Sequence, residues 1–179
     1  MRRTSFSLVP FPAAGLPPGI EITGSAGRDA ERLTVRYDLR GPLTQLVIPA
    51  PADMPARRGK LWEDTCFEFF LCPKNSDSYW EFNLSPAGHW NVYRFSSYRQ
   101  RMQEEPAFAS LPFSVEVRPD VLRLSLELDL TTIVQRDRTF SVGISAVIKL
   151  ADGKITCWAL AHRGPEPDFH RRDGFILEL

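Results

Sequence analysis

Four polar side chains in residues 61–101 could bind a small ligand or move protons. Glu68 and Glu81 offer carboxylates, Asn83 offers an amide and Arg94 offers a guanidinium. These groups supply fixed acceptors and donors for a small polar ligand, and the charged ones form the stronger hydrogen bonds. Two neighbouring carboxylates could also serve as the paired acids of a glycoside hydrolase.

Tryptophans could complete such a site, because a small ligand can lie against a flat apolar ring. The candidates are Trp62, Trp90 and Trp158. Trp80 alternates with apolar neighbours and is predicted to lie in the core. Trp158 and His162 belong to a hairpin that turns at Asp152-Gly153. Closing this hairpin symmetrically places both residues on the outer face and Cys157 in the core.

Alternating polarity predicts the strands that must position these residues. The large apolar residues of one strand face the core and leave Glu68 outside, and the next strand leaves Glu81 and Asn83 outside. Closing the connecting loops symmetrically places Glu68 opposite Asn83, Glu81 opposite Arg94, and Trp90 at the edge of the group. The four polar residues would then converge on three neighbouring strands. They fit a ligand-binding face and equally fit a structural network beneath a covering loop.

Short strands are predicted along most of the chain. Fifteen prolines and 11 glycines in 179 residues favour turns over long helices. Alternation predicts strands at residues 33–39, 43–48, 66–71, 79–85, 90–95, 113–117, 122–128, 140–150 and 155–162. A tight turn at Pro119-Asp120 places Glu116 opposite Arg123. The pattern predicts one all-β domain over residues 1–179, an antiparallel β-sandwich with jelly-roll or immunoglobulin-like connections.

Helical turns are expected to be few and short. Residues 100–110 contain Pro106, and Leu130–Arg136 could form about two turns capped by Asp129. The proline-containing segments 10–19 and 49–59 are predicted to be loops.

Composition and charge exclude several classes of protein. Lys and Arg number 22 and so do Asp and Glu, so no basic excess favours a nucleic-acid partner. No membrane span is found, and prolines interrupt the apolar stretch that an export signal requires, so a cytoplasmic location is expected. Cys66 and Cys72 on one strand lie about 20 Å apart, too far for a disulfide, so buried free thiols are expected there and at Cys157. Exposed edge strands leave a dimer open.

Three blocks of sequence carry a family resemblance. They are LWEDTCFEF (61–69), YWEFNLSP (79–86) and WNVYRF (90–95), with WALAH (158–162) and PDFH (167–170) as a late motif. The chain resembles the DOMON-like domains related to type 9 carbohydrate-binding modules, above all bacterial proteins in which this domain is the whole chain. The resemblance implies a β-sandwich that binds sugars, or haem in other DOMON relatives. It makes the polar face and Trp62, Trp90 and Trp158 binding candidates.

Three functions follow from these residues and the resemblance. The leading hypothesis is a non-catalytic domain, without a cofactor, that binds a saccharide or another small polar ligand. A haem or redox domain needs axial ligands, for which His89, His162, His170 and Met102 are the candidates. An enzyme would use Glu68 and Glu81, although no established catalytic motif is found. A metal site from Cys157, His162 and His170 and an anion site in the loop 163–174 are further possibilities.

Overall fold

The structure is a computed structural model that describes residues 2–12, 16–133 and 138–179. Strands are the main regular structure of these residues, and four short 3-10 helices lie between them. The strands are β1 (Arg2–Pro10), β2 (Glu21–Asp29), β3 (Arg32–Arg40), β4 (Cys66–Pro73), β5 (Tyr79–Leu84), β6 (Trp90–Phe95), β7 (Gln103–Glu104), β8 (Phe113–Arg118), β9 (Val121–Asp129), β10 (Phe140–Lys149), β11 (Ile155–Ala159) and β12 (Leu177–Glu178). The 3-10 helices are η1 (Leu43–Gln45), η2 (Leu61–Glu63), η3 (Leu130–Thr132) and η4 (Arg172–Gly174).

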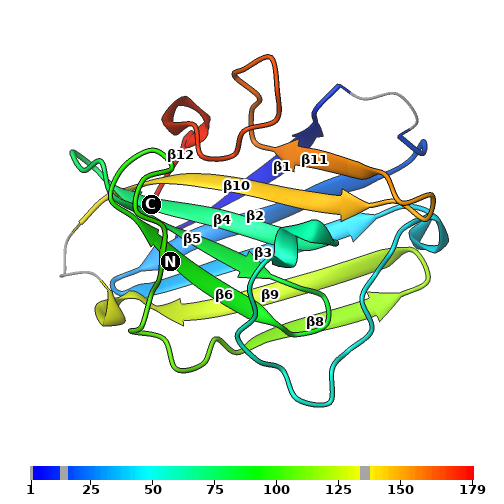
Figure 1. The fold of residues 1–179 in the computed structure, drawn as a ribbon, viewed down its shortest axis with the longest axis horizontal. Coiled ribbons are helices and arrows are strands. Elements are labelled where there is room, and N and C mark those ends of the chain that lie inside the picture. Colours follow the sequence, from blue (N-terminus) through cyan, green and yellow to red (C-terminus); the bar gives the residue numbers. More distant parts are fainter. Residues whose placement is uncertain (1, 13–15, 134–137) are drawn as a thin grey trace.

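The strands pair in one continuous antiparallel order, β7-β6-β5-β4-β10-β11-β1-β2-β3-β9-β8, and β12 pairs with β10 beside this path. β1 joins the two halves, because residues 2–8 pair with β2 whereas Val9 and Pro10 pair with β11. The strip folds back so that the half containing β2, β3 and β9 lies against the half containing β4, β5 and β10 (Figure 1). The predicted all-β antiparallel sandwich is confirmed.

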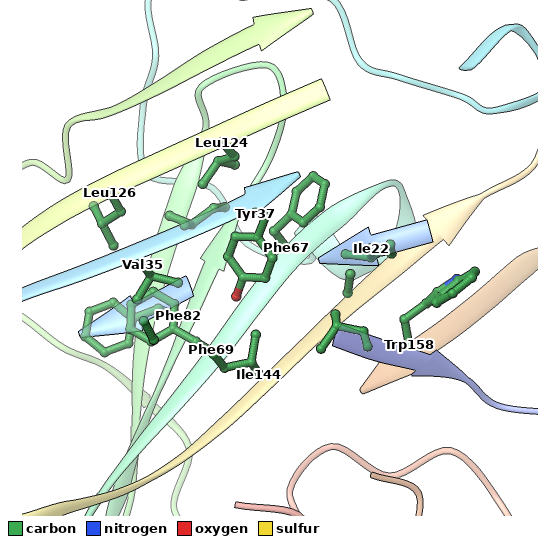
Figure 2. Close-up of a cluster of buried hydrophobic side chains, with 14 of the residues drawn as sticks. Ile22, Val35, Tyr37, Phe67, Phe69, Phe82, Leu124, Leu126, Ile144 and Trp158 are labelled. Carbon is green, nitrogen blue, oxygen red and sulfur yellow. The ribbon is translucent and has the colours of Figure 1, made fainter. Parts of the chain in front are cut away.

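The main core lies between the two halves. Figure 2 shows Tyr37, Val35 and Leu124 from one half pointing toward Phe67, Phe69 and Phe82 from the other. The rings of Phe69 and Phe82 stack with centroids 4.4 Å apart. The buried Tyr37 hydroxyl donates a hydrogen bond of 2.7 Å to the Glu68 carbonyl oxygen. This bond links the two halves and satisfies a polar group that would otherwise be buried without a partner.

Alternation predicted β3 and β9 correctly, whereas the predicted ranges did not include β1 or β2. Leu33, Val35, Tyr37 and Leu39 are buried in β3, and the leucines of β9 from Leu122 to Leu128 are buried beside them. Glu116 pairs with Arg123 as predicted, with a side-chain N–O distance of 3.9 Å.

The predicted strand at residues 43–48 is wrong. Leu43–Gln45 forms the 3-10 helix η1, and only Leu46 makes an isolated bridge, to Leu150. Pro42 has no N–H for a strand ladder, and its carbonyl instead accepts the Gln45 N–H at 2.9 Å, which closes a tight turn.

The two helical candidates also differ from expectation. Residues 100–110 are not helical: Gln103 and Glu104 form β7, and the Glu105 carboxylate accepts hydrogen bonds from the Ala107 N–H and the Trp80 indole. Asp129 caps η3 as predicted, accepting the Thr131 N–H at 2.9 Å, but η3 ends at Thr132. Residues 134–136 of that candidate, and 13–15 of the predicted first loop, lie outside the described residues.

All three cysteines are free, with Cys66 and Cys72 buried and Cys157 half-buried. Within the described ranges, no helix has both the length and the apolar character needed to cross a membrane.

Candidate functional site

β4 and β5 are buried on both faces, which is unusual for a sandwich whose outer face meets solvent. Their inner residues join the main core. Their outer residues include Glu68, Phe70, Tyr79, Glu81 and Asn83, and these too are buried. Something therefore covers the outer face of this half.

The cover is the segment that follows β11, which lies above β10 and β4 in Figure 1. Phe175 packs on Phe70 with ring centroids 5.4 Å apart, in a second apolar cluster on the outer face. The cluster consists of Phe70, Cys72, Tyr79, Tyr93, Phe95 and Phe175, with Trp62 and Phe169 packed against it. Gly143 permits this contact, because a Cβ there would lie 2.5 Å from the Phe175 ring.

A pocket of about 430 Å³ remains between the sheet and this cover. It is lined by Trp62, Glu68, Glu81, Phe95, Arg99, Met102, Val147, Ile155, Cys157, Pro167, Phe169 and His170. The two glutamates come from β4 and β5, so the base of the pocket is rigid sheet. The rest of the wall comes from β6, β10 and β11, from loops and from η2, and Met102 and Ile155 are exposed at the rim.

Strand register brings the two glutamates together. Glu68 pairs with Asn83, as predicted, and Phe70 pairs with Glu81. Glu68 and Glu81 are therefore diagonal neighbours on one face, a relation in which long side chains reach one another. The Asn83 amide donates to Glu81 Oε1 at 2.8 Å, so three of the four predicted polar residues share the face.

The two carboxylates are deeply buried, with Glu68 3% and Glu81 4% exposed. Within the part of the chain that the structure describes, Glu81 Oε2 has no hydrogen-bond partner, and no side chain donates to the Glu68 carboxylate. Burial, and then the proximity of Glu81, raise the pKa of Glu68 well above its ordinary value. Burial raises the pKa of Glu81 to about 7, although the Asn83 hydrogen bond and Arg99 oppose the change.

His170 reaches into the same pocket from the covering segment. Its Nδ1 lies 2.8 Å from the Tyr79 hydroxyl, and its Nε2 lies 3.7 Å from Glu81 Oε2. Burial, and then Arg99, lower the pKa of His170 to about 4. The ordinary order of the two groups is thus inverted, and near pH 6 the proton lies on Glu81 while His170 is neutral.

An ion pair fastens the cover to the neighbouring turn. Arg99 donates to Asp168 at 2.8 Å, and the Tyr98 hydroxyl donates to the same carboxylate. The Asp168 carboxylate also accepts a hydrogen bond of 3.1 Å from the backbone N–H of His170, which helps to position that residue. Arg99 has a φ of +53°, a left-handed conformation that is uncommon for a residue with a side chain. These contacts hold Arg99 at the mouth of the pocket.

The predicted register between β5 and β6 is wrong by one residue. Glu81 pairs with Tyr93, and Arg94 pairs with Trp80. Arg94 therefore lies on the opposite face, exposed, with its guanidinium 5.6 Å from the centre of the Trp80 ring. The connection between the strands has five residues rather than four, because Gly88 adopts a φ of +90° and its N–H bonds to the Ser85 carbonyl oxygen.

The hairpin of β10 and β11 shows the same error for the same reason. Gly153 has a φ of +86°, and its N–H bonds to the Leu150 carbonyl oxygen, so Lys149 rather than Leu150 pairs with Ile155. Trp158 consequently faces the core opposite Ala146, and Cys157 faces the pocket.

The predicted aromatic residues separate into two groups. Trp62 lines the pocket and packs edge-on against Tyr93 at 5.9 Å. Trp90 and Trp158 belong to the main core, where Arg57 stacks 4.4 Å above the Trp90 ring. Their rings do not face the pocket, so the predicted positions of Trp90 at the edge of the polar face and of Trp158 on the outer face are wrong.

His162 also lies away from the pocket. Its Nε2 is 3.0 Å from the Val9 carbonyl oxygen, and its ring packs edge-on against Phe11. In the late loop that suggested an anion site, two arginines have protein partners: Arg171 pairs with Asp173 at 2.7 Å, and Arg172 donates to the Ser76 carbonyl oxygen.

The candidate haem ligands do not converge on one position. His170 and Met102 both line the pocket, but both ring nitrogens of His170 already face protein groups. His89 instead accepts the Ala56 N–H. Among the described residues, no group of three or more His, Cys, Asp or Glu side chains is placed to hold a metal ion. The residues present therefore do not fit a haem with two protein ligands.

Sequence reasoning missed several pocket residues. Arg99, Phe95 and Phe169 were not proposed, Cys157 was considered only as a metal ligand, and His170 was considered only as a metal or haem ligand or as part of an anion site. The late motif around Asp168 and His170 was the available signal, since a polar run after the last long strand could cover a sheet face.

Comparison with solved structures identifies the fold. A protein from Bacteroides uniformis, described as a candidate carbohydrate-binding protein, superposes with a TM-score of 0.73 at 16% sequence identity, over 96% of this chain and 83% of that one. This chain shares its fold.

Two structures of a family 9 carbohydrate-binding module from Caldicellulosiruptor kristjanssonii also align, one in complex with glucose and one with cellotriose. Their TM-scores are 0.47 and 0.44 at 12% and 11% identity, over 80% and 81% of this chain and 69% and 67% of theirs. No protein-family model and no curated protein matches the sequence.

Proposed function

We propose that residues 1–179 form one binding domain that holds a saccharide, without chemical conversion, in the pocket above Glu68 and Glu81. The observation that carries the proposal is the pocket itself, about 430 Å³ with two buried carboxylates at its base. Its volume lies in the range of small-molecule sites, which combine mostly apolar walls with a few polar groups.

The pocket walls suit a sugar ring. Trp62, Phe95 and Phe169 supply aromatic surface, and the carboxylates supply acceptors that the described residues leave free. The description of the Bacteroides uniformis protein as a candidate carbohydrate-binding protein supports the same function for this fold.

A glycoside-active enzyme is the second candidate, and one observation favours it. The pKa of Glu81, raised to about 7, keeps a proton on a pocket carboxyl near neutral pH, as a general acid requires. Incubation of the protein with oligosaccharides that it binds separates the two functions. Released reducing ends that disappear in Glu81→Gln would favour the enzyme, and intact oligosaccharides favour the binding domain.

A glycan array followed by isothermal titration calorimetry tests the proposal. We expect saccharide binding by the wild type and an affinity at least about tenfold lower in Trp62→Ala, because an aromatic contact of this kind contributes on the order of 1 kcal/mol or more. Val117→Ala, at an exposed position of β8, is the control and should bind as the wild type does. A wild type that binds no saccharide on the array, or binding that Trp62→Ala leaves unchanged, would refute the proposal.

A further inference from the structure

Among the residues that the structure describes, the pocket brings together two buried carboxylates and no cation that neutralises them. Arg99 is the basic side chain among its lining residues, and Asp168 pairs with it at 2.8 Å. His170 lies 3.7 Å from Glu81, but its lowered pKa keeps it neutral at physiological pH. With both glutamates ionised, the pocket would carry two uncompensated negative charges.

Such charges are costly in this setting, because isolated ions lose their hydration when they are buried. In the empty pocket, protons remove much of this cost, as the raised pKa values of both glutamates indicate. A ligand that brings a positive charge can take the place of those protons. A neutral ligand cannot, and it would remove the remaining water from around the carboxylates as well.

The free acceptor atoms match one kind of cation. Asn83 occupies Glu81 Oε1, which leaves Glu81 Oε2 and the two carboxylate oxygens of Glu68. An alkylammonium group has three N–H donors. Aromatic rings attract such cations at short range, and Trp62 and Phe95 line the same pocket.

We propose that the ligand carries a cationic amine and that this ammonium group binds between Glu68 and Glu81. Resting on the proposed function above, the inference names the ligand class as a saccharide that bears an amino group.

Proton release should accompany binding. The ionisable groups that line or border the pocket are Glu68, Glu81, His170, Tyr79, Tyr93, Cys66, Cys157, Arg99 and Asp168. An ammonium group favours the ionised carboxylates, so it expels their protons. Affinity for a permanently charged amine should therefore rise with pH below about 7, by about tenfold per pH unit for each proton released.

Three trisaccharides that differ only at carbon 2 provide the test: the β-1,4-linked trimer of glucosamine, its N-acetylated form and cellotriose. Calorimetry at pH 7 should show the glucosamine trimer binding at least about tenfold more tightly than the other two. Glu68→Gln should abolish this preference, whereas Glu63→Gln, which removes an exposed carboxylate on η2, should keep it. Thermal melting checks that each variant is folded.

A fourth probe, n-butylammonium, separates the amine from the sugar. It stays charged between pH 5.5 and 7.5, so its affinity should rise over that range and fall in Glu68→Gln. Equal or tighter binding of cellotriose or the acetylated trimer would overturn the amine inference and leave saccharide binding standing. If only n-butylammonium binds and Glu68→Gln loses this binding, the result would support the amine site and overturn the proposal that the ligand is a saccharide. Binding of none of the four would overturn both.

Discussion

Replacement of Glu81 by glutamine tests where the proton lies in the pocket. Glutamine keeps an oxygen that can accept the Asn83 hydrogen bond of 2.8 Å but cannot ionise. In the wild type, the folded state holds the Glu81 proton up to about pH 7, whereas the unfolded chain releases it near 4.5. The folded state therefore binds more protons between these values, and this carboxyl makes stability fall as pH rises.

The size of the effect follows from the two values. A rise of the Glu81 pKa from 4.5 to about 7 corresponds to about 3 kcal/mol of unfolding free energy, at roughly 1.4 kcal/mol per pH unit for one proton. The free energy of unfolding of Glu81→Gln, minus that of the wild type, should thus increase by about 3 kcal/mol from pH 4.5 to above 7. Loss of the Glu81 charge also removes the repulsion that raises the pKa of Glu68. This makes the difference in the free energy of unfolding between the variant and the wild type increase further with pH.

Urea unfolding followed by tryptophan fluorescence, at intervals of one pH unit from 4.5 to 8, measures this difference. Glu63→Gln controls for the change in net charge, because its side chain is 64% exposed. A difference that stays constant with pH would refute the placement of the proton on Glu81. A difference that falls with rising pH would mean that Glu81 is ionised in the folded protein and stabilised by a group that the structure does not provide.

Three further changes test other parts of the structure. His170→Asn removes a group whose lowered pKa makes the folded state resist protonation. In urea unfolding, the wild-type free energy of unfolding should therefore fall by about 3 kcal/mol relative to that of the variant from pH 6.5 to 4. A difference between the two proteins that does not change with pH would contradict the lowered pKa. Arg57→Met removes the donor to Asn91 and to the carbonyl oxygens of Glu105 and Phe108. It should lower the free energy of unfolding by about 2 kcal/mol or more. Arg58→Met, at an exposed neighbouring position, is the control and should change the free energy of unfolding little. Gly24→Ala would place a Cβ 2.0 Å from the Arg36 carbonyl oxygen and should lower the free energy of unfolding by about 3 kcal/mol or more. Gly164→Ala, whose Cβ would have no neighbouring atom closer than 3.5 Å, is its control. A melting temperature of Gly24→Ala equal to that of the wild type would contradict the close approach of β2 and β3.

The sequence predicts the faces of the strands better than their pairing. Alternation assigned Glu68, Glu81 and Asn83 to one face, because burial of large apolar side chains decides which way a strand turns. Pairing depends on loop geometry, and one extra residue in a turn inverts the faces that meet. Gly88 and Gly153 each adopt a positive φ and lengthen the turn by one residue, which moved Arg94 and Trp158 to the opposite face from the predicted one.

No periodic pattern in the sequence predicts the segment that covers the outer face. Phe169 and His170 are adjacent and are separated from Phe175 by Arg171-Arg172-Asp173-Gly174, in a stretch with little regular structure, so neither strand nor helix periodicity applies to them. Their contacts depend on the shape of the sheet beneath, including the space above Gly143. Arg99 likewise enters the site through a turn whose strained backbone is held by Asp168.

The way in which β1 spans both halves also limits how this protein can meet other chains. A sandwich of two separate sheets has four edge strands, each with unpaired backbone groups that another chain could extend. Here the described strands form one path that ends only at β7 and β8, while β12 pairs beside it. β7 has two residues, and β8 presents the charged side chains of Glu116 and Arg118. Sharing one strand between the halves therefore joins them into a path with two terminal strands, and these two strands are short or charged.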